Sequence, residues 1–168
     1  AGDCCEGIDL STGKPDMLAI QPVAVEHGRL AGQNMAGQKT AHRGSLNMNV
    51  LDTMGLISSS FGLWQGSPEG QTSKAVDEAN FKYLKLNFLG DRLIGAQCVD
   101  TTDNIGVLRG LIQTGFRLGV WKDRLMSEPE RFREAYVAVA GGWPRTMPGG
   151  RSTNAPVQHP ENMNAIRI

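Results

Sequence analysis

The stretch FKYLKLNFLGDRLIGAQCV, residues 81–99, carries the clearest structural signal in this chain of 168 residues. Two runs rich in alternating apolar residues flank Gly90-Asp91, a pair typical of the tight turn between antiparallel strands. Leu84, Leu86 and Phe88 occupy alternate positions, so they point to one face of the first strand. The pattern predicts a β-hairpin with that face covered by other elements.

Strand-like character begins further upstream, in the segment SLNMNVLDTMGLISSSFG, residues 45–62. Leu46, Met48 and Val50 alternate with polar neighbours, and two glycines follow where a strand bends or is closely approached. With the hairpin, this segment predicts an antiparallel sheet.

The residues after the hairpin change to a helical period. Thr101, Thr102 or Asp103 can cap a helix whose apolar residues recur at helical spacing: Ile105, Leu108, Ile112 and Phe116. Shorter helical runs follow at 120–126 and 129–140. We therefore expect an α+β fold in which helices pack on one face of an antiparallel sheet.

The two ends of the chain show other patterns. Residues 1–19 lack an apolar period and are expected to form a loop, whereas Pro22 and Gly37 are placed to start and stop a helix over 22–36. This helix is rich in Ala and Gly, so its surface suits either tight helix packing or a flat ligand. The tail 141–168 is rich in Pro and Gly and predicts an extended arm.

Composition limits the function classes. The chain has 17 basic and 17 acidic residues and no net charge, which argues against nucleic acid or an anionic membrane surface as a partner. No apolar run is long enough to span a membrane, and the first residues do not resemble a signal peptide. We expect a cytoplasmic protein with no membrane or nucleic-acid partner.

Cysteine and histidine positions give no catalytic motif. Cys4, Cys5 and Cys98 lack the spacing of a disulfide framework or a zinc site, so they are expected to be ordinary thiols. The three histidines, His27, His42 and His159, are scattered along the sequence. His159-Pro160-Glu161 is expected to be a solvated loop rather than an acid–base pair.

One ordered set of residues resembles a known family. The chain begins with AGD, and after a loop the helix QPVAVEHGRLAGQNMAG, residues 21–37, reads A-x-x-x-G-R-x-A-x-x-N-x-x-G. This resembles the last flavin-binding element of the FAD-dependent pyridine nucleotide-disulfide oxidoreductases. The motif residues are Ala24, Gly28, Arg29, Ala31, Asn34 and Gly37.

The following segments strengthen the resemblance. NVLDTMGLISSSFG, GDRLIGA, LRGLIQ and FREAYVA resemble the C-terminal interface domain of NADH oxidase-like and of nitrite or rubredoxin reductase-like members. The resemblance covers about residues 1–139. It implies a remnant of the FAD-binding domain at 1–37, an interface or dimerisation domain at 44–140, and a tail at 141–168.

The resemblance also implies cofactor contacts. Asp3 would bind a ribityl hydroxyl of FAD, and Gly2 would allow close backbone approach. Pro22, Val23 and Ala24 would lie at a helix N-terminus, where free N–H groups and the positive end of the dipole stabilise negative charge on the flavin. Cys4 and Cys5 would only line this region, and His159-Pro160 does not match the acid–base motif of the disulfide reductases.

These features predict the C-terminal part of an FAD-dependent NAD(P)H oxidoreductase that closes the flavin pocket and forms a homodimer. Phe116, Leu118 and Trp121 suggest an interface near the 104–118 helix. The family's dinucleotide-binding motifs are not in this sequence, so the chain alone is expected to lack FAD and activity. The alternatives are a self-standing interaction module, a separate subunit of a flavoprotein complex, and a redox protein that uses Cys4 and Cys5.

Overall fold

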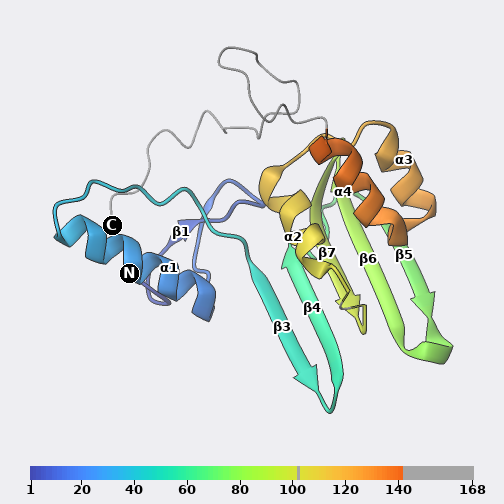
Figure 1. Cartoon of the computed structure of the whole chain (residues 1–168), viewed down its shortest axis with the longest axis horizontal. Helices are drawn as coiled ribbons and strands as arrows, with labels where there is room; N and C mark the ends of the chain where they lie inside the picture. The colour runs from blue at the N-terminus through green and yellow to red at the C-terminus, as the bar shows by residue number, and fades with distance from the viewer. Residues whose placement is uncertain (102, 142–168) are drawn as a thin grey trace. The chain divides into compact units, whose positions relative to one another are not determined.

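The computed structural model describes residues 1–101 and 103–141, so the predicted tail lies outside the described residues apart from Gly141. The chain divides into two compact units, the first formed by Ala1–Met48 and the second beginning at Asn49. Figure 1 shows the elements of both. The domain boundaries expected from the family resemblance stay a prediction.

A small hairpin and one helix make up the first unit. β1 (Gly7–Ile8) pairs antiparallel with β2 (Pro15–Asp16), and α1 spans Gln21–Met35. The expected helix is thus confirmed, shifted by one residue at each end. The expectation of a plain loop over 1–19 is wrong, because four of its residues pair as strands too short to show an apolar period.

Backbone hydrogen bonds hold the segment after α1 against the hairpin. The Leu10 N–H donates to the carbonyl of Ser45 at 2.9 Å, and the Ser45 N–H donates to the carbonyl of Ile8 at 2.8 Å. Gly44 lies beside this bridge with a φ of 106°, where a Cβ would come within 3.1 Å of the Leu10 side chain and the Ile8 carbonyl oxygen. Glycine therefore allows residues 8–10 and 45 to approach each other.

A five-stranded sheet organises the second unit. Its order is β3-β4-β7-β6-β5, and the pairs β4–β7, β7–β6 and β6–β5 are antiparallel. The strands are β3 (Met48–Thr53), β4 (Leu56–Gly62), β5 (Gln71–Asp77), β6 (Lys82–Leu89) and β7 (Arg92–Val99).

The predicted hairpin is confirmed as β6 and β7. Leu84, Leu86 and Phe88 are all at most 2% exposed and face the helices. Leu86 pairs with Ala96 on β7 and with Ser73 on β5, so one face of three strands forms a continuous core layer. The short helix η1 (Glu78–Asn80) connects β5 to β6.

Helices pack on one face of the sheet, as expected. The helices are α2 (Ile105–Thr114), α3 (Val120–Ser127) and α4 (Phe132–Gly141), with a 3₁₀ turn η2 (Pro129–Arg131) before α4. Figure 1 shows α2 and α4 over the sheet; α2 contacts β7 and β4, and α3 contacts β5. Leu108, Leu111 and Leu125 are at most 1% exposed beneath them. The α+β fold class is confirmed.

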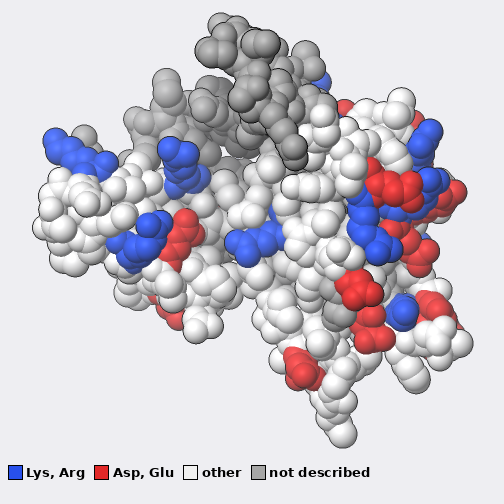
Figure 2. All heavy atoms as spheres, viewed as in Figure 1, with Lys and Arg blue, Asp and Glu red and all other residues white. Residues whose placement is uncertain are grey.

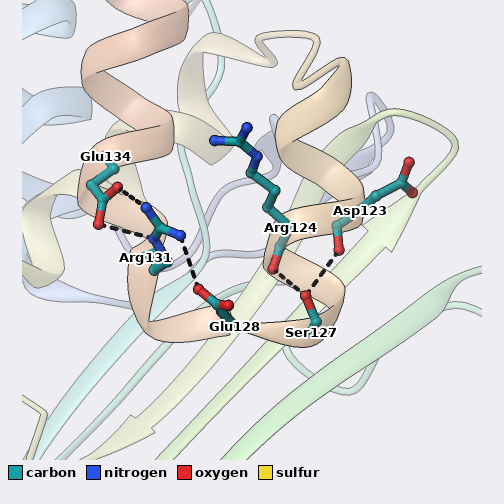
Figure 3. Close-up of polar contacts among 6 residues, drawn as sticks. All are labelled: Asp123, Arg124, Ser127, Glu128, Arg131 and Glu134. Carbon is teal, nitrogen blue, oxygen red and sulfur yellow. Dashed lines mark hydrogen bonds and ion pairs between the residues drawn. The ribbon is translucent and has the colours of Figure 1, made fainter.

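Two exposed ion pairs lie at the start of α4 (Figure 3). The Arg131 guanidinium lies 3.0 Å from a carboxylate oxygen of Glu128 and 2.6 Å from one of Glu134. It also lies 5.9 Å from the Trp121 ring, which Arg124 approaches at 4.9 Å. The Trp121 ring thus makes cation–π contacts with two arginines of its own chain.

Two of the residues that suggested a dimer interface are core residues. Phe116 is 7% exposed and Leu118 is 2% exposed. Both lie in the connection between α2 and α3, so their apolar character is explained by packing within the chain. No helix among the described residues is long and apolar enough to cross a membrane.

Candidate functional site

The predicted flavin contacts Gly2 and Asp3 lie in an open turn. Gly2 has a φ of 91°, and a Cβ on it would meet no atom within 4 Å. Asp3 is exposed, and its carboxylate has no hydrogen-bond or ion-pair partner within the part of the chain that the structure describes. Both residues are therefore accessible to a group outside this chain.

The start of α1 is less open than the sequence suggests. The N–H groups of Val23 and Ala24 each donate to the carbonyl oxygen of Ile20 at 3.0 Å, and Val23 is only 4% exposed. Pro22 has no N–H to offer. These amides are thus not free, and what this end of α1 presents is chiefly its dipole. The roles of Pro22, Val23 and Ala24 as flavin contacts stay a prediction.

In the helix motif that carries the family resemblance, some residues have a structural role within this chain and others do not. The Asn34 side chain donates to the carbonyls of Leu30 and Thr40 and accepts the Thr40 N–H, so Asn34 ties the helix end to the loop beyond it. Gly37 follows with a φ of 86°, which ends the helix. In contrast, a Cβ at Gly28 would meet nothing within 4 Å. Nothing in the described structure requires glycine there.

Five side chains of the first unit form a hydrogen-bonded series, which we term the imidazole cluster: Cys5, Glu26, His27, His42 and Ser45. Cys5 Sγ lies 3.1 Å from His27 Nδ1, and His27 Nε2 lies 3.3 Å from His42 Nε2. His42 Nε2 lies 3.0 Å from Ser45 Oγ, which donates to Glu26 Oε2 at 2.9 Å. The series links a thiol to a carboxylate through two imidazoles.

The two imidazole rings are buried and in contact. His27 is 1% exposed and His42 is 5% exposed, and their ring centroids lie 4.4 Å apart in a T-shaped arrangement. Gly7 makes this possible, because a Cβ there would lie 3.1 Å from atoms of both rings. Burial, reinforced by the neighbouring His27, lowers the pKa of His42, although Glu26 opposes the shift.

His27 and His42 lie apart in the sequence but meet in the structure, whereas His159 lies outside the described residues. His27 occupies the buried stripe of α1 with Val23 and Leu30. A histidine in place of an apolar residue on that stripe is the signal that sequence reasoning missed. Its partners come from loops, whose approach no residue spacing indicates. No group of three metal-binding side chains is arranged to hold a metal within the described ranges.

The second unit has a hollow of about 340 Å³ between β5, β6, the end of β7 and η2. Its charged lining holds four carboxylates against two cations: Asp77, Asp100, Asp103, Glu130, Lys82 and Arg133. A surplus of negative charge disfavours the phosphates of a dinucleotide. The hollow is therefore a poor candidate for a cofactor site.

Several solved structures have a fold similar to that of this chain. A NAD-dependent persulfide reductase from A. fulgidus shares 26% sequence identity, with a TM-score of 0.61 over 71% of this chain and 25% of its own. An FAD-dependent pyridine nucleotide-disulphide oxidoreductase from Desulfovibrio vulgaris shares 18%, with a TM-score of 0.62 over 84% of this chain and 38% of its own.

A covalent putidaredoxin reductase–putidaredoxin complex gives a TM-score of 0.66 at 16% identity, over 83% of this chain and 32% of the matched one. No protein-family model and no curated protein matches the sequence. The chain spans well under half the length of each of these solved structures. It is therefore similar in structure to a C-terminal portion of the pyridine nucleotide-disulphide oxidoreductases.

Proposed function

We propose that this chain is the C-terminal part of an FAD-dependent NAD(P)H oxidoreductase, in which the first unit completes the flavin pocket and the second unit mediates dimerisation. The observation that carries the proposal is the open Gly2-Asp3 turn ahead of α1, in a chain with this fold. The 26% identity with the persulfide reductase supports it, and the Desulfovibrio structure is of an FAD-dependent enzyme.

The residues of the first unit suit a supporting role around FAD. The Asp3 carboxylate, which has no partner among the described residues, can accept a hydrogen bond from a ribityl hydroxyl, and Gly2 has no side chain to obstruct that approach. The positive end of the α1 dipole favours negative charge beside it. When bound, FAD would supply the capacity to accept a hydride from NAD(P)H.

The role of Asp3 is tested in the full-length protein. We expect Asp3→Ala to weaken FAD binding about tenfold, because a hydrogen bond to a charged group contributes about 1.5–3 kcal/mol. The measurement is flavin absorbance per polypeptide after dialysis against a range of FAD concentrations. Glu6→Ala is the matched control, because Glu6 is also exposed and lies three residues away.

Equal FAD retention by Asp3→Ala, Glu6→Ala and wild type would overturn the flavin-contact role. A separate observation tests whether the chain is part of a longer protein. If the gene encodes a hydrophobic strand and two GxGxxG motifs upstream of Ala1, the chain is the end of a two-dinucleotide flavoprotein. If it does not, the chain is a separate subunit or interaction module.

The interaction-module alternative is favoured by one feature, the β3–β4 hairpin. Val50, Leu51 and Met54 are more than half exposed, although all three are large and apolar. Residues 48–62 include a single charged residue, Asp52, and Figure 2 shows this part of the surface almost without charge. Such a surface suits a protein partner. The same feature supports homodimerisation.

A further inference from the structure

The thiol of Cys5 differs from the neighbouring thiol of Cys4 in its surroundings. Cys4 is exposed, and among the described residues its Sγ has one hydrogen-bond contact, with the Ala1 carbonyl oxygen at 3.7 Å. Cys5 is half-buried, with Sγ 3.1 Å from His27 Nδ1 and 3.2 Å from the carbonyl oxygen of Gly2. Two adjacent cysteines therefore offer an internal comparison, in which only one thiol contacts an imidazole.

The proton positions in the imidazole cluster can be deduced by starting from Glu26, because its carboxylate can only accept hydrogen bonds. The Ser45 hydroxyl has one hydrogen, and it donates that hydrogen to the Glu26 carboxylate. Ser45 Oγ can then only accept from His42 Nε2, 3.0 Å away, so His42 carries a proton on Nε2. The lowered pKa of His42 keeps this ring neutral near pH 7.

The same reasoning extends to His27. Its Nε2 lies 3.3 Å from the Nε2 of His42, and that protonated nitrogen has no lone pair, so His27 Nε2 cannot donate a hydrogen there. A neutral His27 must therefore hold its proton on Nδ1, the nitrogen that faces Cys5 Sγ. The cluster thus fixes the tautomer in which His27 donates a hydrogen bond to the sulfur. Such a donor stabilises a thiolate.

We propose that Cys5 is a reactive thiol, activated by the His27 Nδ1–H, that forms mixed disulfides with small disulfides. The thiol proton is lost to water, and the Cys5 thiolate attacks one sulfur of the disulfide. A bond forms between Cys5 Sγ and that sulfur while the original S–S bond breaks, and the second sulfur leaves as a thiolate. Cys5 is oxidised and the small disulfide is reduced. The flavin takes no part in this step.

Each residue of the imidazole cluster has a defined task in this reaction. His27 contacts the reacting sulfur, whereas His42, Ser45 and Glu26 position the His27 proton through the hydrogen-bonded series. Gly7 lets the two rings meet. Cys98 takes no part, because burial raises the pKa of its thiol to about 11.

The test compares single-thiol reactivity in the 168-residue chain with 5,5′-dithiobis(2-nitrobenzoate) and glutathione disulfide as probes. The variant Cys4→Ser leaves Cys5 as the accessible thiol, and Cys5→Ser leaves Cys4. We expect the Cys4→Ser protein to react about tenfold faster at pH 7, although Cys4 is the more exposed thiol. Equal rates, or a faster reaction at Cys4, would overturn the proposal.

The role of His27 is tested in the Cys4→Ser background. His27→Gln is expected to slow the reaction to the rate of the Cys4 thiol. If circular dichroism shows that this buried substitution unfolds the protein, Ser45→Ala provides the second test. This variant keeps the backbone hydrogen bonds of residue 45 but removes the hydroxyl that accepts the hydrogen bond from His42. A several-fold slower reaction is expected, with the rate rising at higher pH than in the Cys4→Ser parent. An unchanged pH–rate profile in Ser45→Ala would contradict the tautomer assignment.

Discussion

Gly95 shows how a single residue fixes the path of the chain beside the hairpin. It lies on β7 opposite Gly62 and Asn87, where the segment after β4 passes over the sheet. A Cβ on Gly95 would lie less than 3.0 Å from backbone atoms of Leu63 and Trp64. Because backbone atoms cannot rotate away as a side chain can, only glycine fits this position.

We therefore predict that Gly95→Ala lowers the free energy of unfolding by about 3 kcal/mol, the upper part of the range for overpacking. Urea denaturation measures the change. The control is Gly106→Ala on α2, where a Cβ meets nothing within 4 Å and alanine is the better helix former, so that variant should be neutral or stabilising. Similar losses of unfolding free energy in both variants would mean that a clash between a Cβ at Gly95 and the neighbouring backbone is not the cause.

His42 gives a prediction about pH. Its folded-state pKa is lowered by burial and by His27, so protonation favours the unfolded chain. The contribution to stability is complete above the unfolded pKa of about 6.5 and is lost as the pH falls toward the folded-state pKa. We expect the free energy of unfolding to decrease between pH 7 and pH 5, and the decrease to be smaller in His42→Gln. An NMR titration midpoint of His42 at or above 6.5 would contradict this.

Among the elements, the sequence predicted those with a strong apolar period. The β6–β7 hairpin and helices α1, α2 and α4 all place apolar side chains at regular spacing against the core. β5, in contrast, was not predicted, because Gln71–Asp77 is mostly polar and exposes most of its side chains at the sheet edge. Only its pairing with β6 identifies it as a strand, and pairing is a tertiary property.

The imidazole cluster was unpredictable for a related reason. Its members come from a loop, from α1 and from the segment after α1, and they meet because backbone hydrogen bonds join residues 8–10 to residue 45. No periodic pattern in the sequence marks either that backbone bridge or the space that Gly7 leaves for the two rings. Sequence reasoning could identify single unusual residues, such as a histidine on a buried helix stripe, but not their partners.

Two polar side chains of β6 hold the connection between β4 and β5: Lys85, whose Nζ donates to the carbonyls of Trp64 and Gln65, and the buried Asn87. Asn87 is 1% exposed, and its Nδ2 donates to the carbonyl oxygens of Leu63 at 3.0 Å and Trp64 at 2.8 Å. Its Oδ1 accepts from the Thr72 hydroxyl at 2.9 Å. One amide thus joins the connection and β5 to the centre of the sheet.

Asn87→Asp keeps the shape but replaces both donated hydrogens with a carboxylate facing two carbonyl oxygens. We predict a loss of about 3 kcal/mol or more in the free energy of unfolding, because two hydrogen bonds are lost and a charge is buried. The control is Asn49→Asp on the exposed edge strand β3, which should cost little. The loss should shrink at low pH, where the new carboxyl is protonated; a loss independent of pH would point to a packing effect instead.

On the scale of the whole molecule, the two units have different surfaces to offer. The first unit presents the open turn at Gly2-Asp3, which is the proposed flavin contact, and the second presents the apolar β3–β4 hairpin. Since Phe116 and Leu118 are buried, the hairpin is the better candidate for a contact with a second copy of the chain. β3 is also an edge strand, so its outer backbone groups remain available for pairing.

We predict that Leu51→Lys weakens homodimerisation, because it places a charge in the centre of the proposed apolar contact. Sedimentation equilibrium should show the dissociation constant rising about thirtyfold, equivalent to about 2 kcal/mol. Val137→Lys is the matched control, since Val137 on α4 is likewise a large apolar residue that is more than half exposed. If only Val137→Lys dissociates the dimer, the interface lies over the helices, and if the wild-type protein is a strict monomer at high concentration, dimerisation itself is wrong.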